Sequence, residues 1–380
     1  AKMRIEKARI SGPQFLFTIV CFLQASSFLT LFVVDVARQD SWIVILSGIV
    51  CFLPVLWLYR TLMVRFPDKN LLQVFEEVYG RAVGKVLGLL YVWYFITLTS
   101  LNLADLGSIT ESAVMERTSM VVLLVMCVIV SSWAVWFGIR VVTRYSFLFS
   151  SLAVLILTAS VLFLMSQMDL QNFLPMLDQP VMKYVQGTHV ITTIPFGELV
   201  ALLMITPNLQ LSGKEISKYL FSGFLLGGIY FLITMVRDIA VLGNTMNLYS
   251  FPSLMAFRLI NLGNALSRME ILFVIALVLL LFFKITFLQY VSVAAVAQLT
   301  ETRSFRHLAL AAGALMAAYG LTMHQPSEVQ YAVTGPESTP IVWTFFEIFI
   351  PFLTYLLAKL RKLPKTDGKK PATKGKRCRT

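Results

Sequence analysis

The chain has 380 residues, of which 57% are hydrophobic and 14% are charged, and its mean hydropathy is +0.76. Soluble domains carry about 25% charged residues, so this composition excludes an ordinary soluble protein. The net charge of +12 does not indicate nucleic-acid binding, because the charges lie in short loops and tails beside apolar runs. Apolar runs of about twenty residues can cross a bilayer as helices, whose backbone groups are satisfied internally. We therefore expect an all-α integral membrane protein.

About ten apolar runs set the expected transmembrane helices. The predicted spans are residues 13–34, 41–63, 83–112, 119–138, 143–165, 184–206, 215–241, 267–298, 305–323 and 340–360. The first run resembles a signal peptide, but it is longer than a typical apolar signal core and no small-residue cleavage site follows it. We therefore expect it to remain as the first helix. Segments 70–80 and 248–261 are expected to be short interfacial elements.

The positions of the lysines and arginines predict the orientation of the chain. If the N-terminal segment 1–12 lies inside, about 25 of the 32 lysines and arginines lie on the inner side and about six on the outer side. The positive-inside rule then places both ends of the chain in the cytoplasm. The basic tail, 361–380, is expected to be disordered, with attraction to anionic membrane lipids.

The first and sixth spans each contain residues that weaken a helix near the middle of the bilayer. These are Gln24, Ser26, Ser27 and Thr30 in the first span and Pro195, Phe196, Gly197 and Glu198 in the sixth. Ten spans divide into two halves, 13–165 and 184–360, of inverted topology, and paired breaks at corresponding positions mark a midplane binding site. Freed backbone groups at such breaks suit a zwitterionic amino acid. The alternative is an ordinary proline kink with the polar side chains used for packing.

Three further polar residues lie within spans. Lys284 is deep in the eighth span, where a lysine must pair, lose its proton or line water, and Glu198 is its candidate partner. Lys284 could serve as a coupling charge or replace a bound ion, or the pair could be structural. Thr99 could line a pocket, although such threonines usually bond to their own helix. Glu347 lies nearer the outer end of the last span, which allows a gate or an interfacial role.

Catalytic signatures are missing from the sequence. It has no nucleophile triad, no glycine-rich phosphate loop and no histidine cluster, and its four cysteines have no metal-site spacing. We expect no enzyme activity, no cofactor and no metal.

Several segments resemble the B subunit of bacterial spore germinant receptors, over about residues 7–362. They are KARISGPQFLF near the start, NLLQVFEEVYGRAVGKVLGLLYVWYF from Asn70, PFGE from Pro195, FPSL from Phe251, and RMEILFV with FFKITFLQY in the eighth span. That family is similar to the amino acid–polyamine–organocation transporters. The resemblance implies a leucine-transporter-like fold of two inverted five-helix repeats in which helices 1 and 6 are broken.

The resemblance also implies a function. It implies a nutrient sensor in the spore inner membrane that binds a small germinant, commonly an amino acid, and works with a receptor A subunit and a lipoprotein C subunit. The residues that match the two break regions are Gln24, Ser26, Ser27 and Pro195–Glu198, and those that match the pocket-facing parts of helices 3 and 8 are Thr99 and Lys284.

One difference from the family pattern leaves the class of ligand undecided. Amino acid transporters of this superfamily carry glycines in the first break, whereas the stretch QASSFLT has none, so a sugar, nucleoside or other nutrient remains possible. A secondary transporter, proton-coupled or ion-independent, and a ligand-gated ion pathway are the alternative functions.

Overall fold

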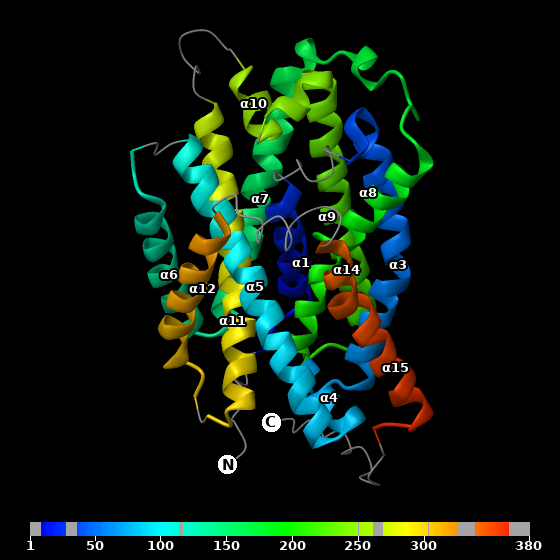
Figure 1. Ribbon diagram of the computed structural model, residues 1–380, viewed down its shortest axis with the longest axis vertical. Coiled ribbons are helices and arrows are strands. Elements are labelled where there is room, and N and C mark those ends of the chain that lie inside the picture. Colours follow the sequence, from blue (N-terminus) through cyan, green and yellow to red (C-terminus); the bar gives the residue numbers. More distant parts are fainter. Residues whose placement is uncertain are drawn as a thin grey trace, which may run out of the picture.

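The computed structural model describes residues 9–27, 36–113, 117–249, 251–260, 269–302, 304–324 and 339–364. Over these residues the chain is a bundle of helices (Figure 1), and strand-type pairing is confined to an isolated parallel bridge between Ile10 and Leu209. The fold class predicted from the sequence, an all-α membrane protein, is confirmed.

Ten apolar helical segments occupy the ten predicted positions. They are α1 (Gly12–Ser27), α3 (Ser41–Arg65), α5 (Arg81–Ala113), α6 (Met120–Trp136), α7 (Ile139–Leu164), α8 (Val181–Thr193) with the 3-10 helix η4 (Gly197–Asn208), α9 (Gly213–Leu242), α11 (Glu270–Leu299), α12 (Leu308–His324), and α14 (Thr339–Thr344) with the π-helical turn η7 (Phe345–Phe349) and α15 (Ile350–Leu360). Seven of them are long and apolar enough to cross a membrane, α6 and α12 are shorter apolar helices, and α1 is described over 16 residues.

Short helices lie at opposite ends of the bundle (Figure 1), where interfacial elements were predicted. At one end, α4 (Leu71–Tyr79) begins at Asn70, whose side chain accepts from the Gln73 N–H while the Gln73 side chain accepts from the Asn70 N–H. This reciprocal cap satisfies two of the N–H groups that a helix start leaves free. At the other end, α10 (Pro252–Arg258) has proline in its first turn, where no N–H is needed.

The centre of the bundle is formed by α1 and its neighbours. Helix α1 packs against α7, α9 and α11, and α11 also packs against α5. Figure 1 shows α1 in the middle, with α6 and α12 towards one side and α3 and α8 towards the other. In the most apolar stretch of the sixth span, 83% of the residues are buried inside the protein, whereas in the corresponding stretch of α7 the share is 33%. The sixth span is therefore an inner helix, while α7 exposes an apolar face that suits lipid.

The sixth span is interrupted at the predicted place. Helix α8 ends at Thr193, the chain turns over residues 194–196, and it continues as η4. Pro195 cannot donate to the helical hydrogen-bond ladder, which explains why the α-helix stops there.

In the first span the structure differs from the prediction, because Gln24, Ser26 and Ser27, expected in a break, are part of the continuous helix α1. Their hydrophobic neighbours and the absence of glycine or proline in this stretch allow the helix to continue. Thr30 falls outside the described residues. The limits of the two repeats, 13–165 and 184–360, stay predictions.

Candidate functional site

An ion pair joins the sixth and eighth spans beside the end of the first. Lys284, in α11, places Nζ 2.5 Å from Oε2 of Glu198, the second residue of η4. The same Nζ donates to the Ser26 hydroxyl of α1 at 2.6 Å. Both charged side chains are at most 5% exposed. Three spans that are distant in sequence are therefore tied together at one point of the core.

Aromatic rings complete the surroundings of Lys284. Its ammonium lies 4.9 Å from the centre of the Phe22 ring, and Phe22 in turn packs edge-on against Phe287. An ammonium over a ring face is attracted by the negative face of the ring. Lys284 is thus held by a carboxylate, a hydroxyl and a ring, which is how a charge can be kept inside a membrane.

Gln24 is the most incompletely bonded polar side chain near this pair. It lies on α1 two residues before Ser26 and is fully buried, and neither its amide nitrogen nor its amide oxygen has a hydrogen-bond partner among the described residues. Each unsatisfied buried group costs about 1–3 kcal/mol. Such groups in native structures call for an explanation, and a ligand or water that supplies the missing partners is a common one.

Two further predicted residues, Ser27 of the first span and Thr99 of the third, donate hydrogen bonds within their own helices. Ser27 donates to the Gln24 carbonyl at 2.8 Å, and Thr99 donates to the Phe95 carbonyl at 2.7 Å. Both side chains are fully buried. Serine and threonine commonly make such hydrogen bonds to carbonyls of their own helix. Within the described part of the chain, neither hydroxyl is therefore oriented by a contact with another helix.

At the break, the backbone and side chains have separate roles. The Phe196 ring is buried against Phe52 and Phe224, with ring centres 5.9 and 4.9 Å apart, and so anchors the turn in the core. Pro195 ends α8, and Gly197 begins η4. The Gly197 carbonyl accepts a hydrogen bond from the Tyr59 hydroxyl at 3.2 Å, which fixes the first turn of η4 against α3.

Glu347 belongs to the same region, although its sequence position favoured the outer end of the last span. It lies in η7 and is fully buried. Its Oε1 accepts from the Tyr94 hydroxyl at 2.6 Å, and its backbone carbonyl accepts from the Tyr59 hydroxyl at 2.7 Å. A Cβ on Gly197 would collide with Oε2 of Glu347, so the carboxyl packs directly on the break. A π-helical turn often marks a functional site, but hydropathy gives no signal for it.

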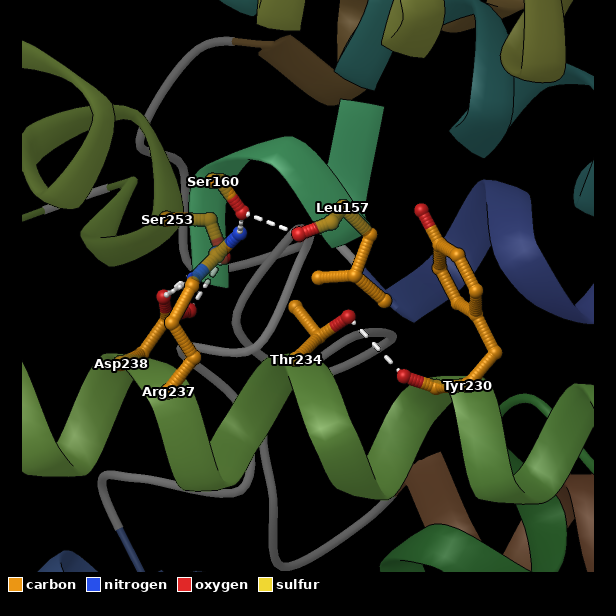
Figure 2. Close-up of polar contacts among 7 residues, drawn as sticks. All are labelled: Leu157, Ser160, Tyr230, Thr234, Arg237, Asp238 and Ser253. Atoms are coloured by element: carbon orange, nitrogen blue, oxygen red, sulfur yellow. Dashed lines mark hydrogen bonds and ion pairs between the residues drawn. The ribbon is translucent and has the colours of Figure 1, made fainter. Parts of the chain in front are cut away.

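A second buried ion pair lies at the α10 end of the bundle (Figure 2). Arg237 and Asp238, adjacent in α9, are at most 1% exposed and contact each other at 2.5 Å. Arg237 also donates to Ser160 of α7 at 2.9 Å, and Asp238 accepts from Ser253 of α10. The guanidinium lies 5.0 Å from the ring centre of Phe257. Arg237, which was counted with the outer loop charges, is therefore an internal residue that fastens α10 to α7 and α9.

The described residues contain no group of three histidine, cysteine or acidic side chains that could hold a metal. The site is built instead from one ammonium, two carboxyls, an amide and hydroxyls. These groups can bind a small polar molecule or a proton.

Comparison with solved structures gives the fold. Mhp1, a nucleobase-cation-symport-1 family transporter in a closed conformation with bromovinylhydantoin bound, matches with a TM-score of 0.62 at 11% identity, covering 91% of this chain and 89% of that one. Its inward-facing conformation matches with a TM-score of 0.57 at 15% identity, covering 95% and 78%. The chain thus has the leucine-transporter-like fold of a multi-pass membrane protein.

Comparison with known sequences gives the family. "Spore germination protein KB" of Bacillus subtilis (strain 168) is 25% identical over 370 residues, 96% of this chain and 98% of the relative. "Putative spore germination protein YfkT" of the same organism is 23% identical over 334 residues, 87% and 90% of the two chains. A family profile described as "Spore germination protein" matches residues 9–328. The chain belongs to the spore germination protein family.

Proposed function

We propose that this chain is the nutrient-sensing membrane subunit of a spore germinant receptor. It binds a small germinant, an amino acid, between the end of α1 and the break before η4. The observation that carries the proposal is the buried Gln24 amide, which lacks both a donor and an acceptor partner among the described residues. A ligand that carries both kinds of group would satisfy it.

The chemistry of the break supports an amino acid. Backbone N–H groups released at a helix break attract a carboxylate, and released carbonyls attract an ammonium. Residues 194–196 form the turn, Gly197 begins η4, and the Lys284 ammonium contacts both Ser26 of α1 and Glu198 of η4. Because Lys284 is already paired with Glu198, we expect it to serve as a fixed charge beside the break, as an ion mimic or coupling group, and not to bind the carboxylate itself.

Membership of the family supports the setting of this function. We place the chain in the spore inner membrane, with both ends in the cytoplasm, beside a receptor A subunit and a lipoprotein C subunit. Membrane lipids surround it, and nucleic acid is not a partner. Ligand binding would shift the bundle against these subunits, which requires that the ligand bind the two states with different affinities.

Thermal unfolding of the purified chain against a nutrient panel tests the ligand. A ligand that binds only the folded state stabilises it by about 2.7 kcal/mol at 100 times its Kd. We expect one or a few amino acids to raise the Tm. If sugars or nucleosides raise it and amino acids do not, the ligand class is wrong. If spores lacking this protein germinate normally with every nutrient, the sensor role is wrong.

Secondary transport of the same nutrient is the second candidate, which the fold shared with a transporter favours. Uptake of the nutrient into proteoliposomes that contain this chain alone would favour transport over sensing. A nutrient-evoked conductance in reconstituted membranes would instead indicate a ligand-gated ion pathway.

A further inference from the structure

Two buried carboxyls lie at the break in the sixth span, and they are balanced differently. Glu198 has the Lys284 ammonium at 2.5 Å. Glu347 is fully buried, and its carboxyl makes one hydrogen bond, from the neutral hydroxyl of Tyr94. Its second oxygen, Oε2, has no hydrogen-bond partner among the described residues. Glu198 therefore has a neighbouring positive charge that balances its own, whereas Glu347, in the same site, has only a neutral hydrogen-bond donor in the described part of the chain.

Among the described residues, the charged pair that acts on Glu347 is Lys284 and Glu198. The titratable and charged side chains that face it or its helical turn are Tyr59 of α3, Tyr91 and Tyr94 of α5, Glu198 of η4, Lys284 of α11 and, through a hydrogen bond to Thr344, His189 of α8. Asp105 of α5 lies within electrostatic reach of the same pair. The described groups thus include three acids and one ammonium, and that ammonium is directly engaged by Glu198 and Ser26.

A carboxylate in such a place is costly unless it is paired. Burying an ionised carboxylate without a counter-charge costs so much that the group instead takes up a proton. The hydroxyl of Tyr94 can satisfy a carbonyl oxygen, but it cannot neutralise a charge. Neutral Glu347 removes the problem, because an acid with one carbonyl oxygen and one protonated oxygen carries no net charge.

We propose that Glu347 is a proton-binding site that is occupied in this conformation. Oε1 is the carbonyl oxygen that accepts from Tyr94, and Oε2 carries the proton over the bare backbone of Gly197. The proton is released when η4 and η7 separate and water reaches Oε2. The rearrangement of the break is thereby linked to the release of one proton, in addition to any nutrient that binds there.

The backbone around Glu347 is built to hold the acid at the break. The single proton of the Tyr59 hydroxyl is shared between the carbonyls of Glu347, at 2.7 Å, and Gly197, at 3.2 Å, and so joins η4 to η7. The Tyr91 hydroxyl donates to the Phe346 carbonyl. Carbonyls that a π-helical turn displaces from the regular ladder need such donors. A separation of η4 from η7 must break the shared Tyr59 contact at the moment it exposes Oε2.

Infrared spectroscopy of the purified chain without nutrient tests the proposal. A protonated carboxylic acid has a carbonyl stretch that a carboxylate lacks, and its frequency falls when the proton is exchanged for deuterium. We expect this band at neutral pH in the unmodified protein and its loss in the Glu347→Gln variant. The difference between the two spectra isolates Glu347 from Asp105 and the other acids.

Two matched variants make the assignment independent of folding defects. Tyr94→Phe removes the hydrogen bond to Oε1, so the band should persist and move to higher frequency. Glu198→Gln, the same change on the paired acid, should leave the band in place and lower the Tm, whereas Glu347→Gln should leave the Tm unchanged. The proposal is overturned if the Glu347→Gln spectrum shows no loss of the band, or if Tyr94→Phe either abolishes the band or leaves its frequency unchanged. Because no nutrient is used, these outcomes do not depend on the proposed sensor function.

Discussion

Removing the ammonium of Lys284 should destabilise the chain strongly. In Lys284→Met, the methionine approximates the volume of the lysine stem but leaves Glu198 as a buried charge without a partner and Ser26 without its donor. Because the two charged side chains are only 2% and 5% exposed, solvent offers little compensation. Loss of one partner of such a pair costs about 3–5 kcal/mol. We expect a loss of this size in the free energy of unfolding in detergent.

The double variant Lys284→Met/Glu198→Gln separates the pair from the packing of each side chain. It removes both charges, so the free energy of unfolding should recover to within about 2 kcal/mol of the unmodified protein. The double-mutant cycle would then give a coupling energy of about 3 kcal/mol or more. The reasoning is refuted if the single change costs less than about 1 kcal/mol, or if the two single effects simply add.

Three further changes test separate parts of the structure. Gln24→Leu should leave the free energy of unfolding within about 1 kcal/mol of its original value or raise it, because the amide has no hydrogen bond to lose among the described residues. Gln289→Leu, whose amide donates two hydrogen bonds to other residues, should cost about 1–3 kcal/mol in the same assay, and equal effects would contradict the assignment. Gly197→Ala should lower the free energy of unfolding by about 1–3 kcal/mol, because the new methyl collides with the Glu347 carboxyl. Gly213→Ala, where the new Cβ lies 3.1 Å from a valine methyl, should cost less. A larger drop in Tm for Gly213→Ala than for Gly197→Ala would argue against the contact. Asp238→Asn leaves a buried guanidinium without its anion and should speed hydrogen exchange in α10 more than in α4, and uniform exchange would show that the pair does not fasten α10.

The sequence predicted the helices well, because the bilayer imposes a strong constraint on composition. A run of about twenty apolar residues has few alternatives to a membrane helix, and each of the ten predicted runs contains helix over its described residues. The break at Pro195 was predicted for a local reason, since proline cannot continue the helical ladder. The cost of a lone charge in a membrane left Lys284 three alternatives, of which pairing with Glu198 was one, and the structure shows the two paired.

Features that depend on packing could not be predicted. The π-helical turn at η7 leaves no signal in hydropathy, and the contact of Glu347 with Gly197 depends on how η7 packs against η4. Arg237 is near the end of its span, where a basic residue usually reaches water, but its neighbours on α7 and α10 bury it. The sequence also gave no reason to select Ser26 over Ser27 as the hydroxyl that contacts Lys284, because that choice depends on the rotation of α1.

Nutrient binding by the Gln24→Leu variant tests the central claim most directly. The claim is that the unpartnered amide at the end of α1 contacts the germinant, so the variant should fold and bind it at least about tenfold more weakly, since a lost hydrogen bond of about 1.4 kcal/mol is tenfold in Kd. Gln289→Leu, which changes the same type of side chain in α11, should keep the Kd. Unchanged nutrient affinity in Gln24→Leu, measured by titration calorimetry on the purified chain, would contradict the claim.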